Sequence, residues 1–60
     1  MGIFNNNSKT FGRGDKVIIK YMGVSGIIVD MDGNLYSVSY IDENDREVVE
    51  AFNENDLVKG

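Results

Sequence analysis

The side chains that could do chemistry in this 60-residue chain are ten carboxylates, six basic groups and a few hydroxyls, because it contains no cysteine and no histidine. Paired acids such as Asp42 and Glu43, or Glu47 and Glu50, suit general acid–base catalysis only in a pocket that separates their pKa values. A domain of this length has little interior and no room for a deep cleft. The serines have no histidine to act as their base. We therefore expect a protein that is not an enzyme.

The same composition argues against a metal site or a cofactor. Without cysteine and histidine the usual zinc ligands are missing. Residues 30–34 read Asp-Met-Asp-Gly-Asn, like the start of a calcium-binding EF-hand loop, but such a loop needs glycine at its sixth position and glutamate at its twelfth. Those positions are Leu35 and Ile41. We expect no metal and no cofactor.

The formal net charge of −4 is unevenly distributed along the chain. Residues 1–29 carry four basic groups and one acid, a net charge of +3, whereas residues 30–60 carry nine acids and two basic groups, a net charge of −7. We predict an acidic partner-binding face formed by seven residues: Asp30, Asp32, Asp42, Glu43, Asp45, Glu47 and Glu50. Regularly spaced carboxylates can imitate DNA phosphates. The expected partner is a basic DNA-binding host protein, such as a histone-like nucleoid protein or RNA polymerase, which this protein would inhibit as a DNA mimic.

Short strands must position these acids. Runs rich in β-branched residues and clean alternation predict five strands, over residues 16–21, 27–31, 35–41, 47–52 and 57–59. Segments rich in Gly, Asn and Asp separate them, and residues 53–56 suit a short 3₁₀ turn. No segment shows a helical period over ten or more residues. The sequence therefore predicts an all-β domain over residues 11–60, preceded by a flexible N-terminal tail over residues 1–10.

Four segments together form a recognisable pattern. They are Gly14-Asp15-Lys16-Val17-Ile18-Ile19, the glycines Gly23 and Gly26 with Ile28 after them, Tyr36-Ser37-Val38-Ser39-Tyr40, and Glu54-Asn55-Asp56-Leu57-Val58. This pattern resembles the SH3-like small barrels, especially their KOW and Tudor-type branches, which include small phage- and mobile-element-encoded binding proteins. The resemblance implies a five-stranded barrel, and it implies a core that comprises Val17, Ile19, Ile28, Tyr36 or Val38, and Leu57.

The resemblance also implies a second class of function. KOW modules often bind nucleic acid through basic and aromatic residues, a role open here to Lys16, Lys20 and Tyr21. Tudor modules hold methylated Lys or Arg in an aromatic cage, and the rings could come from Tyr21, Tyr36, Tyr40 and Phe52. A net charge of −4 opposes attraction to phosphates. A module that binds nucleic acid or a modified peptide is therefore the alternative function.

Several apolar residues lie off the expected core face. They are Ile18, Ile27, Val29, Leu35 and Ile41. A single small barrel cannot easily bury both faces of its strands. We therefore expect a homodimer in which these residues pack against a second copy, each Å² of buried apolar surface contributing about 25 cal/mol.

The location of the protein is expected from what the sequence lacks. No apolar run approaches the roughly 18 residues of a membrane span. The N-terminus shows no basic start followed by a long apolar stretch. We expect a cytoplasmic protein.

Overall fold

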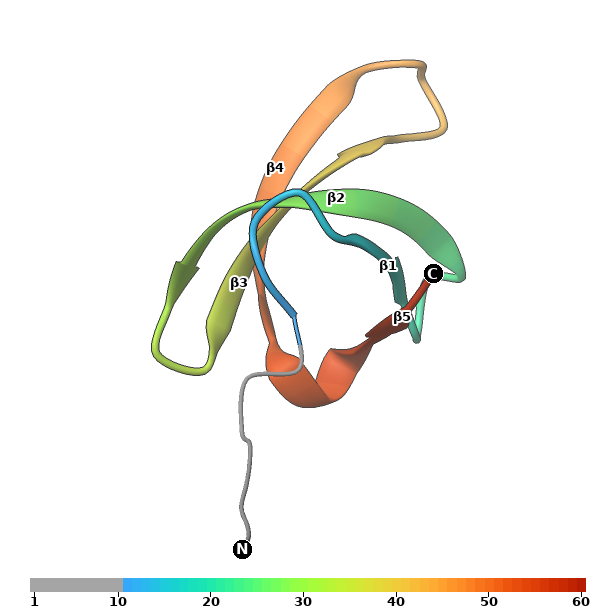
Figure 1. The fold of residues 1–60 in the computed structure, drawn as a ribbon. Helices are drawn as coiled ribbons and strands as arrows, with labels where there is room; N and C mark the ends of the chain where they lie inside the picture. Colours follow the sequence, from blue (N-terminus) through green and yellow to red (C-terminus); the bar gives the residue numbers. More distant parts are fainter. Residues whose placement is uncertain (1–10) are drawn as a thin grey trace, which may run out of the picture.

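The chain forms one antiparallel sheet of five strands in a computed structural model that describes residues 11–60 (Figure 1). The elements are β1 (Lys16–Ile19), β2 (Val24–Asp32), β3 (Leu35–Ile41), β4 (Glu47–Asn53), a 3₁₀ turn η1 (Glu54–Asp56), and β5 (Leu57–Lys59). The prediction of an all-β fold is confirmed. The flexible tail predicted over residues 1–10 lies outside the described residues. Within residues 11–60 no helix is long and apolar enough to cross a membrane.

Turn chemistry explains where the strands begin and end. Gly23 has a φ of 67°, and its N–H donates to the carbonyl of Ile19 at 2.7 Å, which closes the turn between β1 and β2. Glycine adopts such a positive φ without steric cost. The sequence predicted a break over residues 22–26, yet β2 already begins at Val24. Gly26 lies inside this strand, opposite Tyr40, so the predicted start at residue 27 was three residues too late.

Nine apolar side chains form the buried core. They are Phe11, Val17, Ile19, Ile28, Tyr36, Val38, Tyr40, Phe52 and Leu57. Every residue of the expected core is among them, because alternate residues of a strand point to the same face of the sheet. Tyr40 and Phe52 were not in the expected core, and neither was Phe11. Its ring meets that of Tyr36 edge-on, with ring centroids 5.6 Å apart, and this contact fixes the segment before β1 over the core.

The sheet curls around this core, but its two edges do not join (Figure 1). The strand order is β4-β3-β2-β1-β5, so β4 and β5 are edge strands and no ladder pairs them within the described residues. The register of β2 with β3 shifts between Ile28 and Asp30, and the extra residue, Val29, forms a bulge of the kind that bends a strand. The closed barrel implied by the resemblance is therefore not confirmed, and the observed architecture is an open five-stranded sheet.

Strand β4 presents a row of backbone groups to the outside. The N–H of Asp42 donates to the carbonyl of Arg46 at 2.9 Å, and the N–H of Glu54 donates to the carbonyl of Asn34 at 3.0 Å. Hydrogen-bonded pairs recur at every second residue of an antiparallel ladder, so the even-numbered residues of β4 bond to β3. The backbone groups of the odd-numbered residues, such as Val49, face away from β3 and have no strand partner within residues 11–60.

Gly26→Ala is expected to destabilise the fold. The added carbon would lie 2.6 Å from the carbonyl oxygen of Ser39 and 2.6 Å from Val38 Cγ1, so β2 and β3 would have to separate. We expect the free energy of unfolding to fall by roughly 2–3 kcal/mol. Gly12→Ala is the matched control, because nothing lies within 4 Å of its added carbon. Its unfolding free energy should stay within about 1 kcal/mol of the parent. Urea denaturation followed by circular dichroism compares them, and equal losses would contradict the close approach of the two strands.

Candidate functional site

The seven carboxylates predicted to form one face lie at two ends of the sheet. Asp30 and Asp32 pair with Ser37 and Leu35 at the start of β3. Asp42, Glu43 and Asp45 follow the other end of β3 and form the turn into β4. A strand of seven residues spans about 20 Å. The structure therefore brings together the acids after Ile41 but separates them from the two on β2.

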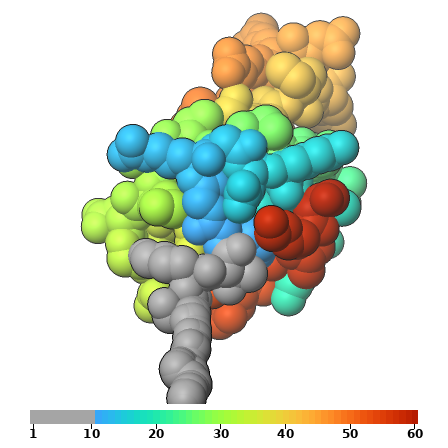
Figure 2. All heavy atoms as spheres, in the orientation of Figure 1, coloured from blue at the N-terminus to red at the C-terminus, as the bar shows by residue number. Residues whose placement is uncertain are grey.

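The segment of residues 42–50, which we call the acidic hairpin, carries the net charge of the chain. It contains five carboxylates and one basic residue, Arg46, and so has a net charge of −4. The other positions contain five acids and five basic residues, which cancel. Figure 2 shows the end of the hairpin, in yellow and orange, protruding above the rest of the molecule. The charge imbalance thus belongs to one projecting element.

Asp42 builds the turn of this hairpin. Its Oδ1 accepts the N–H of Asn44 at 2.8 Å and the N–H of Arg46 at 3.0 Å. Its carbonyl accepts the N–H of Asp45 at 3.0 Å, and Asp45 has a φ of 63°, a left-handed conformation that Asp tolerates better than most residues. Asp42 therefore holds the turn in shape, while Glu43 and Asp45 are exposed.

Glu47 and Glu50 lie on opposite faces of β4, because they are three residues apart in a strand whose side chains alternate. On the outer face Ser39 Oγ donates to Glu47 Oε2 at 2.7 Å. On the inner face the hydroxyl of Tyr40 donates to Glu50 Oε1 at 2.7 Å. This hydrogen bond, together with burial and the charge of Glu50, raises the pKa of Tyr40 to about 12.

Asp30 is already paired within the molecule. Its Oδ1 accepts the N–H of Met31 at 2.9 Å and lies 3.1 Å from Arg13 Nη2. Both contacts hold the pKa of this carboxyl below its usual value, and the backbone hydrogen bond from Met31 is the largest single cause. Both side chains of the ion pair are exposed, so it contributes little to stability. Asp30 consequently adds little free negative charge to the surface.

A groove lies beside the acidic hairpin. It has a volume of about 500 Å³ and is lined by Met22, Val24, Tyr40, Ile41, Asp42 and Glu43. The first four residues offer apolar surface from the β1–β2 turn, β2 and β3, and the last two add carboxylates from the hairpin. The sequence predicted Glu43 as part of the acidic face but did not place Met22 or Val24 beside it. Met22 and Val24 line this groove because the β1–β2 turn lies close to the β3–β4 turn, although the two turns are distant in the sequence.

The residues predicted to bind nucleic acid or a modified peptide do not form one exposed cluster. Tyr21 is 71% exposed and its ring centroid lies 6.2 Å from that of Phe52. Tyr36, Tyr40 and Phe52 are buried in the core, so among the described residues Tyr21 is the only one of the four proposed cage rings with an open face. Lys20 lies beside Tyr21, whereas Lys16 lies at the other end of β1.

Neither a metal site nor a relative defines the function of this surface. Within the described part of the chain no group of three or more His, Cys, Asp or Glu side chains could hold a metal ion. Comparisons of the chain with protein-family models, with curated proteins and with solved structures find no match.

The raised pKa of Tyr40 predicts a loss of stability in strong alkali. The unfolded chain loses this proton near pH 10, whereas the folded chain keeps it to about pH 12. The contribution is therefore complete below pH 10 and disappears as pH rises through 12. Glu50→Gln removes the charge and should return the pKa of Tyr40 toward 10. Absorbance titration of the phenolates near 295 nm measures this shift, with Tyr40→Phe identifying the transition. An unchanged titration in Glu50→Gln would contradict the Tyr40–Glu50 contact.

Proposed function

We propose that this chain is a non-enzymatic binding module that holds basic side chains of a protein partner in the groove beside its acidic hairpin. The observation that carries the proposal is the lining of this groove. Met22, Val24 and Ile41 provide apolar surface, while Asp42 and Glu43 provide carboxylates. A lysine or arginine side chain matches both, because its stem is apolar and its head is charged.

The chemistry of the hairpin favours a partner with many basic residues. Five carboxylates on one projecting element attract cationic groups from a distance, and the attraction weakens with salt. Proteins that bind DNA display such basic surfaces to neutralise phosphates. The proposed partner is therefore a basic DNA-binding host protein, such as a histone-like nucleoid protein or RNA polymerase. In the cytoplasm the hairpin would occupy the place of DNA and inhibit that partner.

The resemblance to small SH3-like barrels is compatible with this role. The strand order β4-β3-β2-β1-β5, in which β1 lies between β2 and β5, and the 3₁₀ turn before β5 support that resemblance. Its KOW and Tudor-type branches suggest the alternative of nucleic-acid or modified-peptide binding through Lys16, Lys20 and Tyr21. The acidic hairpin is the stronger candidate, because its charged groups adjoin an apolar groove whereas three of the four proposed cage rings are buried.

The proposal is tested by titrating the protein with a purified histone-like nucleoid protein and with RNA polymerase, at several salt concentrations. We expect saturable binding at low salt that weakens steeply as salt is added. Glu43→Lys reverses an exposed charge that lines the groove, and it should raise the dissociation constant roughly tenfold, or about 1.4 kcal/mol. Calorimetry or fluorescence anisotropy measures both effects.

The matched control is Asp32→Lys, which makes the same change in net charge at the opposite end of β3. Its dissociation constant should stay within about twofold of the parent, because a rim charge acts locally at moderate salt. Equal weakening by the two variants would show that total charge, not the hairpin, governs binding. A gel shift with DNA or RNA that Lys16→Glu abolishes, without binding to either protein, would favour the alternative function instead.

A further inference from the structure

The outer face of the sheet, which points away from the core, is rich in apolar side chains. Six large ones on it are 40–56% exposed: Ile27, Val29, Leu35, Ile41, Val49 and Val58. Ile27 and Val49 lie on either side of Ser39, since each is opposite this residue on its own strand. The core side chains occupy the other face, and no layer within residues 11–60 covers this one. An apolar face of this kind marks an interaction surface.

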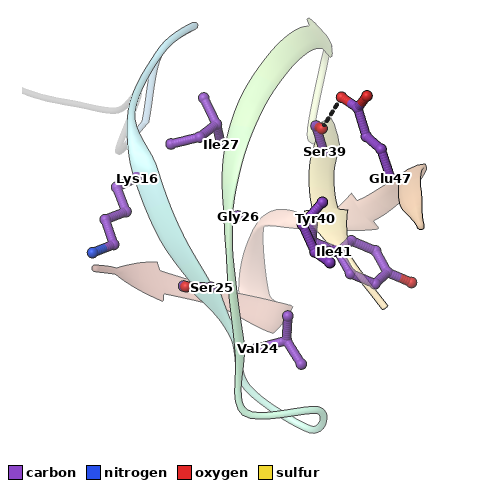
Figure 3. A pocket seen from close by; sticks show the side chains of 9 residues that line it. All are labelled: Lys16, Val24, Ser25, Gly26, Ile27, Ser39, Tyr40, Ile41 and Glu47. Atoms are coloured by element: carbon purple, nitrogen blue, oxygen red, sulfur yellow. Dashed lines mark hydrogen bonds between the residues drawn. The ribbon is translucent and has the colours of Figure 1, made fainter. Parts of the chain in front are cut away.

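A groove of about 450 Å³ crosses this outer face, and its sides carry opposite charges. Lys16 lies at the β1 side and Glu47 at the β4 side, with Ile27, Ser39 and Ile41 among the residues between them (Figure 3). Among the described residues neither charged group forms an ion pair, although Glu47 accepts the hydroxyl of Ser39. The face therefore offers one unpaired positive charge and one unpaired negative charge on either side of an apolar strip.

This arrangement is self-complementary. A twofold axis that lies between two facing copies, at right angles to the line from Lys16 to Glu47, brings the β1 side of one groove to the β4 side of the other. A second copy packed by the same face would then bring its Glu47 to Lys16 and its Lys16 to Glu47, while the apolar side chains met in the middle. Isologous contacts of this type, in which a patch binds itself, are the commonest basis of homodimers.

We propose that two copies of this chain pack outer face to outer face as a twofold dimer, with two Lys16–Glu47 ion pairs flanking an apolar centre. Because the sheet curls around its core, the two convex outer faces meet along the groove rather than over their whole area. Serines at 25, 37 and 39 lie among the apolar residues and allow close approach because they are small. This inference goes beyond the proposed function. Ile41 lines both grooves and would be covered in the dimer, whereas Glu43 and Asp45 at the hairpin turn lie outside the outer-face groove.

Sedimentation velocity of the purified chain, without any partner, tests the dimer. The chain should approach twice its mass of 6.7 kDa as its concentration rises. Lys16→Glu alone would place two pairs of acids against each other, and Glu47→Lys alone would place two pairs of lysines together. Each single variant should therefore raise the dimer dissociation constant at least about tenfold. A one-to-one mixture of the two variants restores both opposite-charge contacts, and should return the dissociation constant to within about threefold of the parent.

Lys20→Glu is the matched control, because it changes the net charge as Lys16→Glu does but lies outside the outer-face groove. It should leave the dimer unchanged, and circular dichroism should show that all variants are folded. A parent chain that stays at 6.7 kDa up to millimolar concentration would overturn the proposal, as would a mixture that dissociates as readily as its components. Because this experiment contains no partner protein, failure of the dimer proposal would not count against partner binding by the acidic hairpin.

Discussion

The register of β3 between its two neighbours determines the rest of the structure. Tyr36, Val38 and Tyr40 point into the core. Val48 and Phe52 of β4 lie opposite Tyr40 and Tyr36, so their side chains point to the same face. The strand period of two then leaves no freedom for the two glutamates of β4. Glu47 lies on the outer face, and Glu50 lies on the inner face beside Tyr40. A shift of β3 by a single residue would move its three core side chains to the outer face.

A chain of 60 residues can cover only one side of such a sheet. The sheet bends over that side through the bulge at Val29 and through the close contact at Gly26, where a side chain would meet the backbone of β3. Curvature encloses the nine core residues, but it turns the other side outward with its apolar residues uncovered. The small core and the exposed outer face are therefore two results of the same geometry, and both follow from the absence of a second layer in the described chain.

Local patterns predicted most of the fold, and non-local geometry accounts for what they missed. Alternation and turn residues act over a few positions, so they identified the five strands, while the resemblance indicated Val17, Ile19 and one of Tyr36 and Val38 as core residues of β1 and β3. Whether β4 meets β5 depends on the curvature of the whole sheet, and the closed barrel was not confirmed. The acids were predicted correctly as surface residues, yet their grouping was not predictable from charge alone. Asp32 and Asp42 lie at opposite ends of β3, and only hairpin connectivity reveals this. Phe11 gave no signal, because an isolated aromatic residue before a glycine-rich turn has no period.

The unpaired edge of β4 gives the carboxylates a second consequence. A strand edge of seven residues is a template to which strands of other molecules can add, and it can start aggregation. β5 is a poor template, since it has three residues and ends in Lys59. β4 has no proline, lysine or bulge, but Glu47 and Glu50 give it a negative charge on both faces. Two such edges repel each other, so the acids keep these sheets from joining edge to edge even when no partner is bound.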